Sequence, residues 1–161
     1  MRTGKRYGVD VGKVRIGLAE SDDEGILATP VETVHVGASD VRKIARIVRE
    51  NNALEVIVGL PVTMKGLEDS STKRARRWAR RLGWAIKPIP VRLFDERLST
   101  VSAHHQLDET GHSHSDRQDI IDQAAAVLIL QTALDNERLT GRPPGELLEI
   151  IDREKHEEND E

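Results

Sequence analysis

Short apolar runs along this chain alternate with longer amphipathic runs, which is the pattern of an α/β protein. Three β-favouring runs come first, separated by short polar turns, and the third contains Pro30, where we expect an interruption. Two more apolar runs follow, each after a helical pattern. The pattern predicts strands over 7–11, 14–19, 26–36, 54–61 and 89–94, and helices over 40–50, 70–82, 99–107 and 116–139.

The order of these elements predicts how the strands are arranged. Three consecutive strands with short connections form an antiparallel meander. Right-handed crossovers through the first two helices then add the strands 54–61 and 89–94 parallel to the first strand. We therefore expect an α/β fold with a mixed five-stranded sheet in the order 3-2-1-4-5 and helices on both faces.

The end of the chain differs in charge from the rest. Residues 146–161 hold eight acids and two bases, so the body keeps 22 bases against 20 acids although the whole chain is at −4. We expect one domain over 1–140 and a flexible acidic tail over 141–161, which lowers non-specific nucleic-acid binding. A short docked helix over 147–151 is the alternative, because four residues there are apolar: Leu147, Leu148, Ile150 and Ile151.

Composition excludes several classes of chemistry. The chain has no cysteine, so disulfides, thiolate metal sites and a cysteine nucleophile are excluded. No apolar run approaches the length of a membrane span, and the first residues lack the apolar core of a signal peptide. We expect a cytoplasmic protein without a membrane partner. The body charge leaves a nucleic-acid partner open.

Asp10 is the first candidate for chemistry. It lies near the end of an apolar strand between Gly8 and Gly12, where a carboxylate must pair, bind a metal or change its pKa. Gly12 and Gly17 leave space for a ligand or another backbone to approach. By itself the stretch fits a phosphate or metal site and a turn aspartate equally well.

Two further acids are expected near Asp10. Glu96 follows the strand 89–94, and Asp122 lies in the first turns of the longest helix, which can pack over the same sheet edge. Three adjacent carboxylates repel one another unless a cation lies between them. Hard oxygen ligands suit Mg²⁺ or Mn²⁺, and such ions can activate water and stabilise the leaving oxygen of a phosphodiester.

A basic helix is the candidate nucleic-acid contact. No acid occurs between Thr72 and Phe94, and four bases share one helical face: Lys73, Arg76, Arg77 and Arg80. Such a face contacts phosphates or is simply solvated, and the sequence supports both interpretations.

Four ordered motifs make the chain similar to the YqgF/RuvX family, the pre-16S rRNA nucleases and Holliday-junction-resolvase-like proteins. They are GVDVGKVRIG, VIVGLP, DERLST and IDQAAAVLILQ, and the resemblance covers about residues 5–139. It implies an RNase H-like fold and a bacterial cytoplasmic nuclease that matures the 5′ end of 16S rRNA. It also implies that Asp10, Glu96 and Asp122 are the catalytic, metal-binding acids. Branched DNA is the alternative substrate, and the oligomeric state is a monomer or a homodimer.

Other residues and other functions complete the hypotheses. Asp119, Arg15 and Arg97 are candidate auxiliary residues, and a histidine group (His104, His105, His112 and His114) is solvated or, as the alternative, a zinc site. The spacing DxGxxxxG also occurs in ATP-binding kinase folds, but those need two such domains and an adenine site. A non-catalytic nucleic-acid module is the third hypothesis, against which the three acids argue.

Overall fold

Six strands form one mixed sheet in the computed structural model, which describes residues 1–99 and 115–150, except the side chains of 115–117. The strand order is β3-β2-β1-β4-β5-β6, so the expected order 3-2-1-4-5 is confirmed and a sixth strand is added. β1 pairs in parallel with β4 and β4 with β5, whereas the other pairs are antiparallel. The strands are β1 (Arg6–Val11), β2 (Arg15–Ser21), β3 (Ala28–His35), β4 (Glu55–Leu60), β5 (Val91–Asp95) and β6 (Glu146–Leu147).

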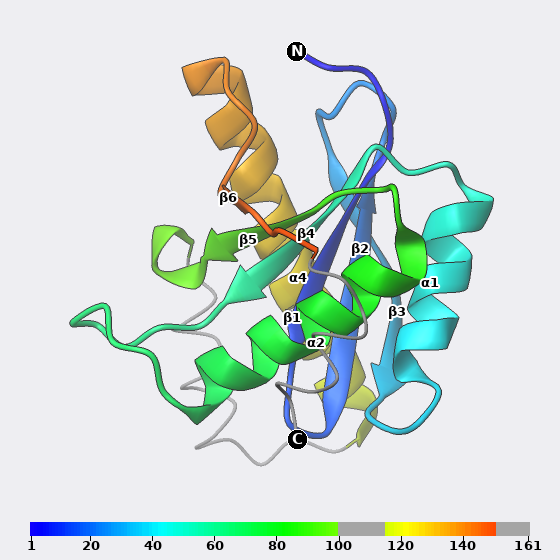
Figure 1. Cartoon of the computed structure of the whole chain (residues 1–161), viewed down its shortest axis with the longest axis vertical. Coiled ribbons are helices and arrows are strands. Elements are labelled where there is room, and N and C mark those ends of the chain that lie inside the picture. The colour runs from blue at the N-terminus through cyan, green and yellow to red at the C-terminus, as the bar shows by residue number, and fades with distance from the viewer. Residues whose placement is uncertain (100–114, 151–161) are drawn as a thin grey trace.

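Helices cover both faces of the sheet, as expected. α1 (Asp40–Glu50) and α2 (Ser70–Ile86) lie on one face, and α4 (Ser115–Thr140) lies on the other (Figure 1). The alternation of β1 shows why: Val9 and Val11 belong to the apolar core under α1 and α2, while Gly8 faces α4. The helix expected over 99–107 lies outside the described residues, apart from its first residue, Ser99.

α2 is longer than its sequence pattern predicts. It continues past Leu82 because Gly83 is tolerated within the helix, and it ends before the cis peptide bond between Lys87 and Pro88. A side chain at Gly83 would collide with Ile150, so the glycine lets the chain end pack against the helix. Its absent side chain therefore serves packing and not termination of the helix.

β3 tolerates Pro30 through a change in register. Leu18 pairs with Glu32 and Ala19 pairs with Pro30, so Val31 is passed over between them. The strand is thus continuous, and the expected interruption appears as a bulge-like irregularity.

Part of the acidic segment belongs to the sheet. Leu147 is in register with Arg92, and the Leu148 amide donates to the Val91 carbonyl at 2.9 Å. The helical turn considered for 147–151 is therefore wrong for its described part, 147–150, which is a short strand followed by irregular chain. Residues 151–161 lie outside the described residues, and a flexible tail there stays a prediction.

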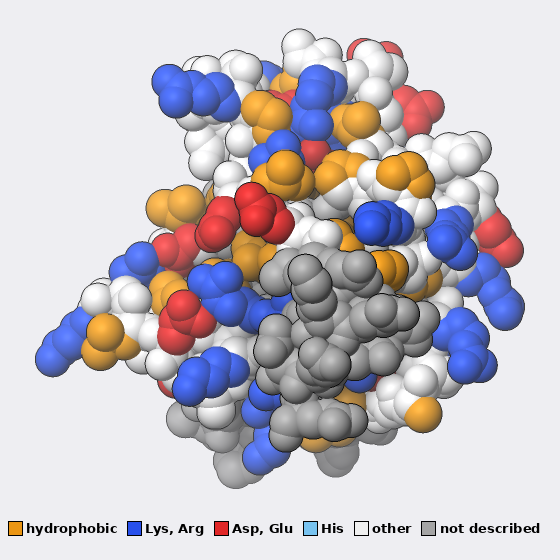
Figure 2. Space-filling model, in the orientation of Figure 1, with side chains coloured by type: hydrophobic (Ala, Val, Ile, Leu, Met, Phe, Trp, Pro, Cys, Tyr) orange, Lys and Arg blue, Asp and Glu red, His pale blue; other side chains and the backbone are white. Residues whose placement is uncertain are grey.

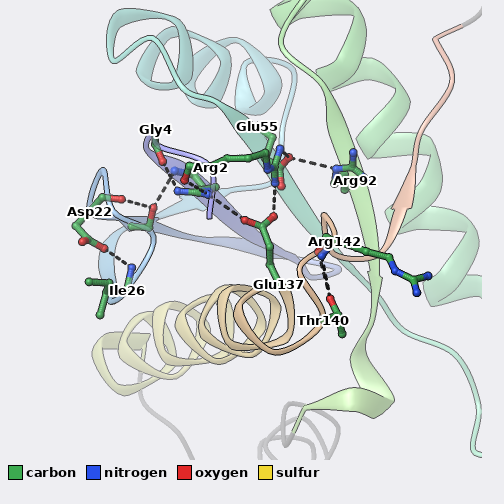
Figure 3. A network of polar contacts seen from close by, with 11 residues as sticks. Arg2, Gly4, Asp22, Ile26, Glu55, Arg92, Glu137, Thr140 and Arg142 are labelled. Carbon is green, nitrogen blue, oxygen red and sulfur yellow. Dashed lines mark hydrogen bonds and ion pairs between the residues drawn. The ribbon is translucent and has the colours of Figure 1, made fainter.

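An ionic network joins the end of the sheet at which β1 and β4 begin to α4 (Figure 3). Glu137 accepts hydrogen bonds from Arg2 and, at 3.2 Å, from Arg6. Glu55 accepts from Arg2 at 2.8 Å and from Arg92 at 3.2 Å. The network joins the N-terminal segment, β1, β4, β5 and the last turns of α4 at the end of β1 remote from Asp10.

Candidate active site

Asp10 occupies a gap in the apolar surface beneath α4. Its side chain is 3% exposed, and it lies directly opposite Gly17 of β2 in the antiparallel register. On the other side, the parallel pairing of Val9 with Val58 is followed by Asp10 and Gly59. The neighbours of Asp10 in both adjacent strands are therefore glycines, which leave space above the sheet on either side of the carboxylate.

Asp122 comes to this space from α4. A side chain at Gly17 would collide with the main-chain carbonyl of Asp122, so the glycine permits the helix to approach β2 closely. Asp122 Oδ2 accepts a hydrogen bond from Arg15 Nε at 3.0 Å, and its Oδ1 accepts one from Gln118 Nε2 at 3.1 Å. The two donors fix the carboxylate at the edge of the cavity described below.

Burial and the charge of Asp10 act on Asp122. Desolvation is the largest effect and raises the pKa of Asp122 above its ordinary value, and the negative charge of Asp10 raises it further. The hydrogen bonds from Gln118 and Arg15 oppose this change. The two carboxylates are thus close enough to repel each other, which is the condition under which a cation between them is stabilising.

Glu96 lies on the Gly59 side of Asp10. It follows β5 in a single 3-10 turn (η1, Glu96–Leu98) and is 2% exposed. A Cβ at Gly59 would lie 2.8 Å from Glu96 Oε1 and 2.5 Å from Ile129 Cδ1. The carboxylate therefore lies over Gly59, in the space that the missing side chain leaves.

A cavity of about 470 Å³ opens at this end of the sheet. Asp10 and Asp122 line it, whereas Glu96 does not belong to its lining. The tight β1–β2 connection, at the lower end of the view in Figure 1, contributes Lys13, and β2 contributes its first residue, Arg15. The first turns of α2 contribute Ser70, Ser71 and Arg74. The cavity is thus lined by two acids together with cationic and hydroxyl side chains. This combination is suited to a phosphate group and its counterion.

The capping of α2 positions the α2 residues that line the cavity. The Asp69 carboxylate accepts from the Thr72 amide at 3.1 Å, and Thr72 Oγ1 accepts from the Asp69 amide at 3.1 Å. This reciprocal pair is a capping box, and the Thr72 hydroxyl also donates to the Pro61 carbonyl at the end of β4. Ser70, Ser71 and Arg74 follow in the helix whose start is tied in this way to the sheet.

The auxiliary residues expected from the sequence divide into two groups. Arg15 lines the cavity and donates a hydrogen bond to Asp122. Arg97 forms an ion pair with Asp95, with 2.6 Å from its Nη2 to Asp95 Oδ2, and neither residue lines the cavity. The Asp119 carbonyl accepts from Thr33 Oγ1 at 2.9 Å, which ties α4 to β3, and Asp119 is also absent from the lining. The histidines at 104, 105, 112 and 114 lie outside the described residues.

The bases of α2 differ in their surroundings, and only part of the predicted set lies at a cavity. Arg76 Nε forms an ion pair with Glu68 at 2.8 Å, so a neighbouring acid exists although none lies within the helix. Of Lys73, Arg76, Arg77 and Arg80, only Arg77 lines a described cavity. Arg74 and Arg81 do so as well, and the sequence-based set omitted both. Figure 2 shows Lys and Arg side chains over α1 and α2 on this face.

Sequence comparison places these features in a family. A family model described as "RuvX: Holliday junction resolvase" matches residues 4–136. This match spans the four strand- and helix-borne motifs and all three acids. The chain belongs to the RuvX family.

Relatives of this RuvX-family chain are named "Putative pre-16S rRNA nuclease". One from Nocardioides sp. is 49% identical over 154 residues, covering 92% of this chain and 99% of the relative. One from Streptomyces coelicolor is 49% identical over 154 residues, covering 94% and 92%. One from Rhodococcus erythropolis is 52% identical over 149 residues, covering 89% and 84%.

A solved structure shows the same fold for the RuvX-family chain. T. thermophilus RuvC in complex with a Holliday junction substrate superposes with a TM-score of 0.55 at 14% identity, covering 90% of this chain and 99% of that chain. The expected RNase H-like fold is confirmed by this likeness. No helix among residues 1–99 and 115–150 combines the length and apolarity needed to cross a membrane.

Proposed function

We propose that this chain is a metal-dependent nuclease that hydrolyses phosphodiester bonds, with Asp10, Glu96 and Asp122 as its catalytic acids. The placement of Asp10 between Gly17 and Gly59 carries the proposal. The main chain of Asp122 lies over the first glycine and the carboxylate of Glu96 over the second. Asp122 of α4 and Glu96 of η1 thus come to Asp10 of β1 from the sides of its two neighbouring strands.

The donor set fits a hard divalent cation. Within residues 1–99 and 115–150, no three Asp, Glu or His side chains are grouped tightly enough to hold an ion as they stand. The pair Asp10 and Asp122 nevertheless shares one cavity and its carboxylates repel each other, and all their ligand atoms are oxygens, which suit Mg²⁺ or Mn²⁺. We propose that these two residues, together with Glu96, hold the metal. When bound, such an ion supplies an activated water and stabilises the leaving oxygen.

The other residues of the cavity bind and orient the substrate. Lys13 and Arg74 are placed to neutralise a phosphodiester, and the hydroxyl groups of Ser70 and Ser71 can donate to its oxygens. Arg15 holds Asp122 in the cavity through their 3.0 Å contact. The reacting phosphate is thereby fixed between the cationic wall and the acids, which is the positioning that hydrolysis needs.

Pre-16S rRNA is the substrate that we propose, with action at its 5′ end during ribosome biogenesis in the cytoplasm. The names of relatives about half identical over most of the chain support this choice. Branched DNA is the second candidate, which the description of the matching family model favours. Both substrates present the same phosphodiester to the same cavity, so they differ in recognition and not in chemistry.

The test combines purified protein with cells. Asp10→Asn keeps the size of the side chain and removes the charge, so with Mg²⁺ or Mn²⁺ it should cleave a pre-16S rRNA fragment more than about 100-fold more slowly. Loss of a mere supporting partner of a metal ligand already costs about 10–100-fold. Asp23→Asn, an exposed residue of the remote β2–β3 turn, is the matched control. In a depleted strain, wild type and Asp23→Asn should restore mature 16S rRNA and Asp10→Asn should not.

The outcomes separate the alternatives. Equal cleavage by Asp10→Asn and wild type contradicts the proposed acids. Cleavage of a four-way DNA junction but not of the RNA favours the resolvase. Binding of either nucleic acid without any cleavage favours a non-catalytic module.

A further inference from the structure

A second, smaller cavity adjoins the candidate active site. It has a volume of about 130 Å³ and lies where α1 and α2 meet the end of β1. Val11, Gly12 and Arg74 line both cavities, so the two are adjacent at these residues. Nothing in the proposed chemistry at Asp10 and Asp122 uses this second cavity.

Its walls are cationic. Three arginines of α2 line it, Arg74, Arg77 and Arg81, and their spacing of three and four residues puts them on one side of the helix. Arg81 keeps 56% of its side chain exposed, and Arg77 is also exposed. Both guanidinium groups are therefore accessible to a ligand from solvent.

The single acid of the second cavity is occupied by protein donors. Asp40 is 2% exposed, and its Oδ2 accepts from the Gly37 amide at 3.0 Å. Its Oδ1 accepts from Trp78 Nε1 at 3.2 Å and lies 3.9 Å from Arg81 Nη2. The buried carboxylate thus positions Trp78 and attracts Arg81, and it leaves the three arginines with a net charge of about +2.

The size of the second cavity selects the ligand. A volume of 130 Å³ corresponds to about four water molecules of roughly 30 Å³ each. That accommodates a phosphate group and is well below the roughly 300–1,000 Å³ typical of sites for whole small molecules. The planar forks of arginine are matched to phosphate oxygens in two-pronged hydrogen bonds.

We propose that this cavity binds a second phosphate of the nucleic-acid strand whose scissile phosphate lies at Asp10. Arg74 lies between the two subsites and contacts both phosphates, and Arg77 and Arg81 hold the second. The strand therefore runs from the acids over Gly12 toward the contact between α1 and α2. This inference rests on the proposed function, because it assigns a path to the substrate of that site.

Charge-matched double variants of α2 test the path. Arg77→Gln/Arg81→Gln removes two charges from the second cavity, and Lys73→Gln/Arg80→Gln removes two charges from the same helix outside it. Binding of a labelled single-stranded RNA is measured by fluorescence anisotropy over a range of salt concentrations in EDTA, so that no cleavage is required. The first variant should lose about 1.4 units from the slope of log K against log salt, as expected for two lost contacts to a single strand, and the second should lose much less.

The result also separates this inference from the proposed function. Equal slopes for the two variants, or a larger loss for Lys73→Gln/Arg80→Gln, would overturn the path even if wild type cleaves RNA normally. The predicted difference in slope without any cleavage by wild type would support the phosphate subsite and contradict the nuclease. Circular dichroism melting of both variants controls for folding, and Arg77→Lys/Arg81→Lys, which keeps the charge, should restore most of the slope.

Discussion

The carboxylate of Glu96 lies in the space that Gly59 leaves empty, with Oε1 only 2.8 Å from where a Cβ would stand. Glu96 comes from the turn after β5, and Gly59 belongs to β4, beside Asp10. A residue without a side chain in one strand thus decides where an acid from the next strand can lie. The relationship explains why the apolar run of β4 contains a glycine just before its end.

Gly59→Ala should therefore displace Glu96. The added methyl group meets the ends of two flexible side chains, Glu96 and Ile129, so we expect a loss of stability of about 1–3 kcal/mol, as for other overpacked sites. Nuclease activity should fall much further than the folded fraction, because the acid moves. Gly37→Ala, which meets nothing within 4 Å, is the control. Full activity of folded Gly59→Ala would argue against a catalytic role for Glu96.

The sequence carried enough information to predict the order of the first five strands and the sheet edge at which Asp10 lies, but not β6. Asp10 is unusual as a carboxylate in an apolar strand, and the alternation of β1 turns it to the face opposite Val9 and Val11. The crossover rule then predicted that β4 and β5 end at the same edge. These are local or topological rules, and they do not depend on the details of packing.

The direction of the basic face of α2 could not be predicted in the same way. Helical periodicity shows which residues share a side but not how the helix is rotated about its axis. In the structure α2 buries one side of the helix, and this side includes Trp78, whose indole donates to Asp40 of α1, 38 residues away in sequence. In this orientation Arg74 and Arg81 line the second cavity, while Arg76 pairs with Glu68. The surroundings of these bases thus depend on acids outside the helix, Asp40 and Glu68, which the helical pattern does not include.

Removal of the Glu137 charge, which faces Arg2 and the buried Arg6, should destabilise the fold. Glu137→Gln removes the charge and leaves two guanidinium groups partly unmatched, and breaking a buried pair in this way costs about 3–5 kcal/mol. Chemical denaturation should show a loss of this size, with little change for the exposed Glu50→Gln. Activity per folded molecule should be unchanged, because the network lies at the other end of β1. A loss below about 1 kcal/mol would show that Arg2 and Arg6 do not depend on the charge of Glu137.

The Asp69 cap of α2 gives a dependence of stability on pH. The Thr72 amide lowers the pKa of Asp69 from its ordinary value of 3.8. The stabilising contribution is therefore complete above that ordinary value and is lost as the pH falls through the lower pKa of the folded state. Asp69→Asn still caps the helix but does not titrate. The melting temperature of wild type should exceed that of Asp69→Asn at neutral pH, and the difference should shrink below about pH 3.8. A difference independent of pH would contradict this assignment.

Two truncations distinguish the docked part of the acidic segment from the part that follows. Ending the chain after Gly145 removes β6, the hydrogen bond that the Leu148 amide donates to the Val91 carbonyl, and the packing of Ile150 against Gly83. We expect a loss of about 2 kcal/mol, typical of one or two partly buried aliphatic side chains, and a lower melting temperature. Ending it after Ile150 keeps these contacts and should leave the melting temperature unchanged.

The second truncation also measures the electrostatic effect of residues 151–161. This segment carries six acids and two bases, so its removal makes the rest of the chain less negative by four charges. If the segment competes with nucleic acid for the cations of α2, the protein ending after Ile150 should bind single-stranded RNA more tightly at low salt. The gain in affinity should shrink as the salt concentration rises toward about 1 M, where the screening length falls to about 3 Å. Unchanged affinity at low salt would show that these acids do not compete for the basic face.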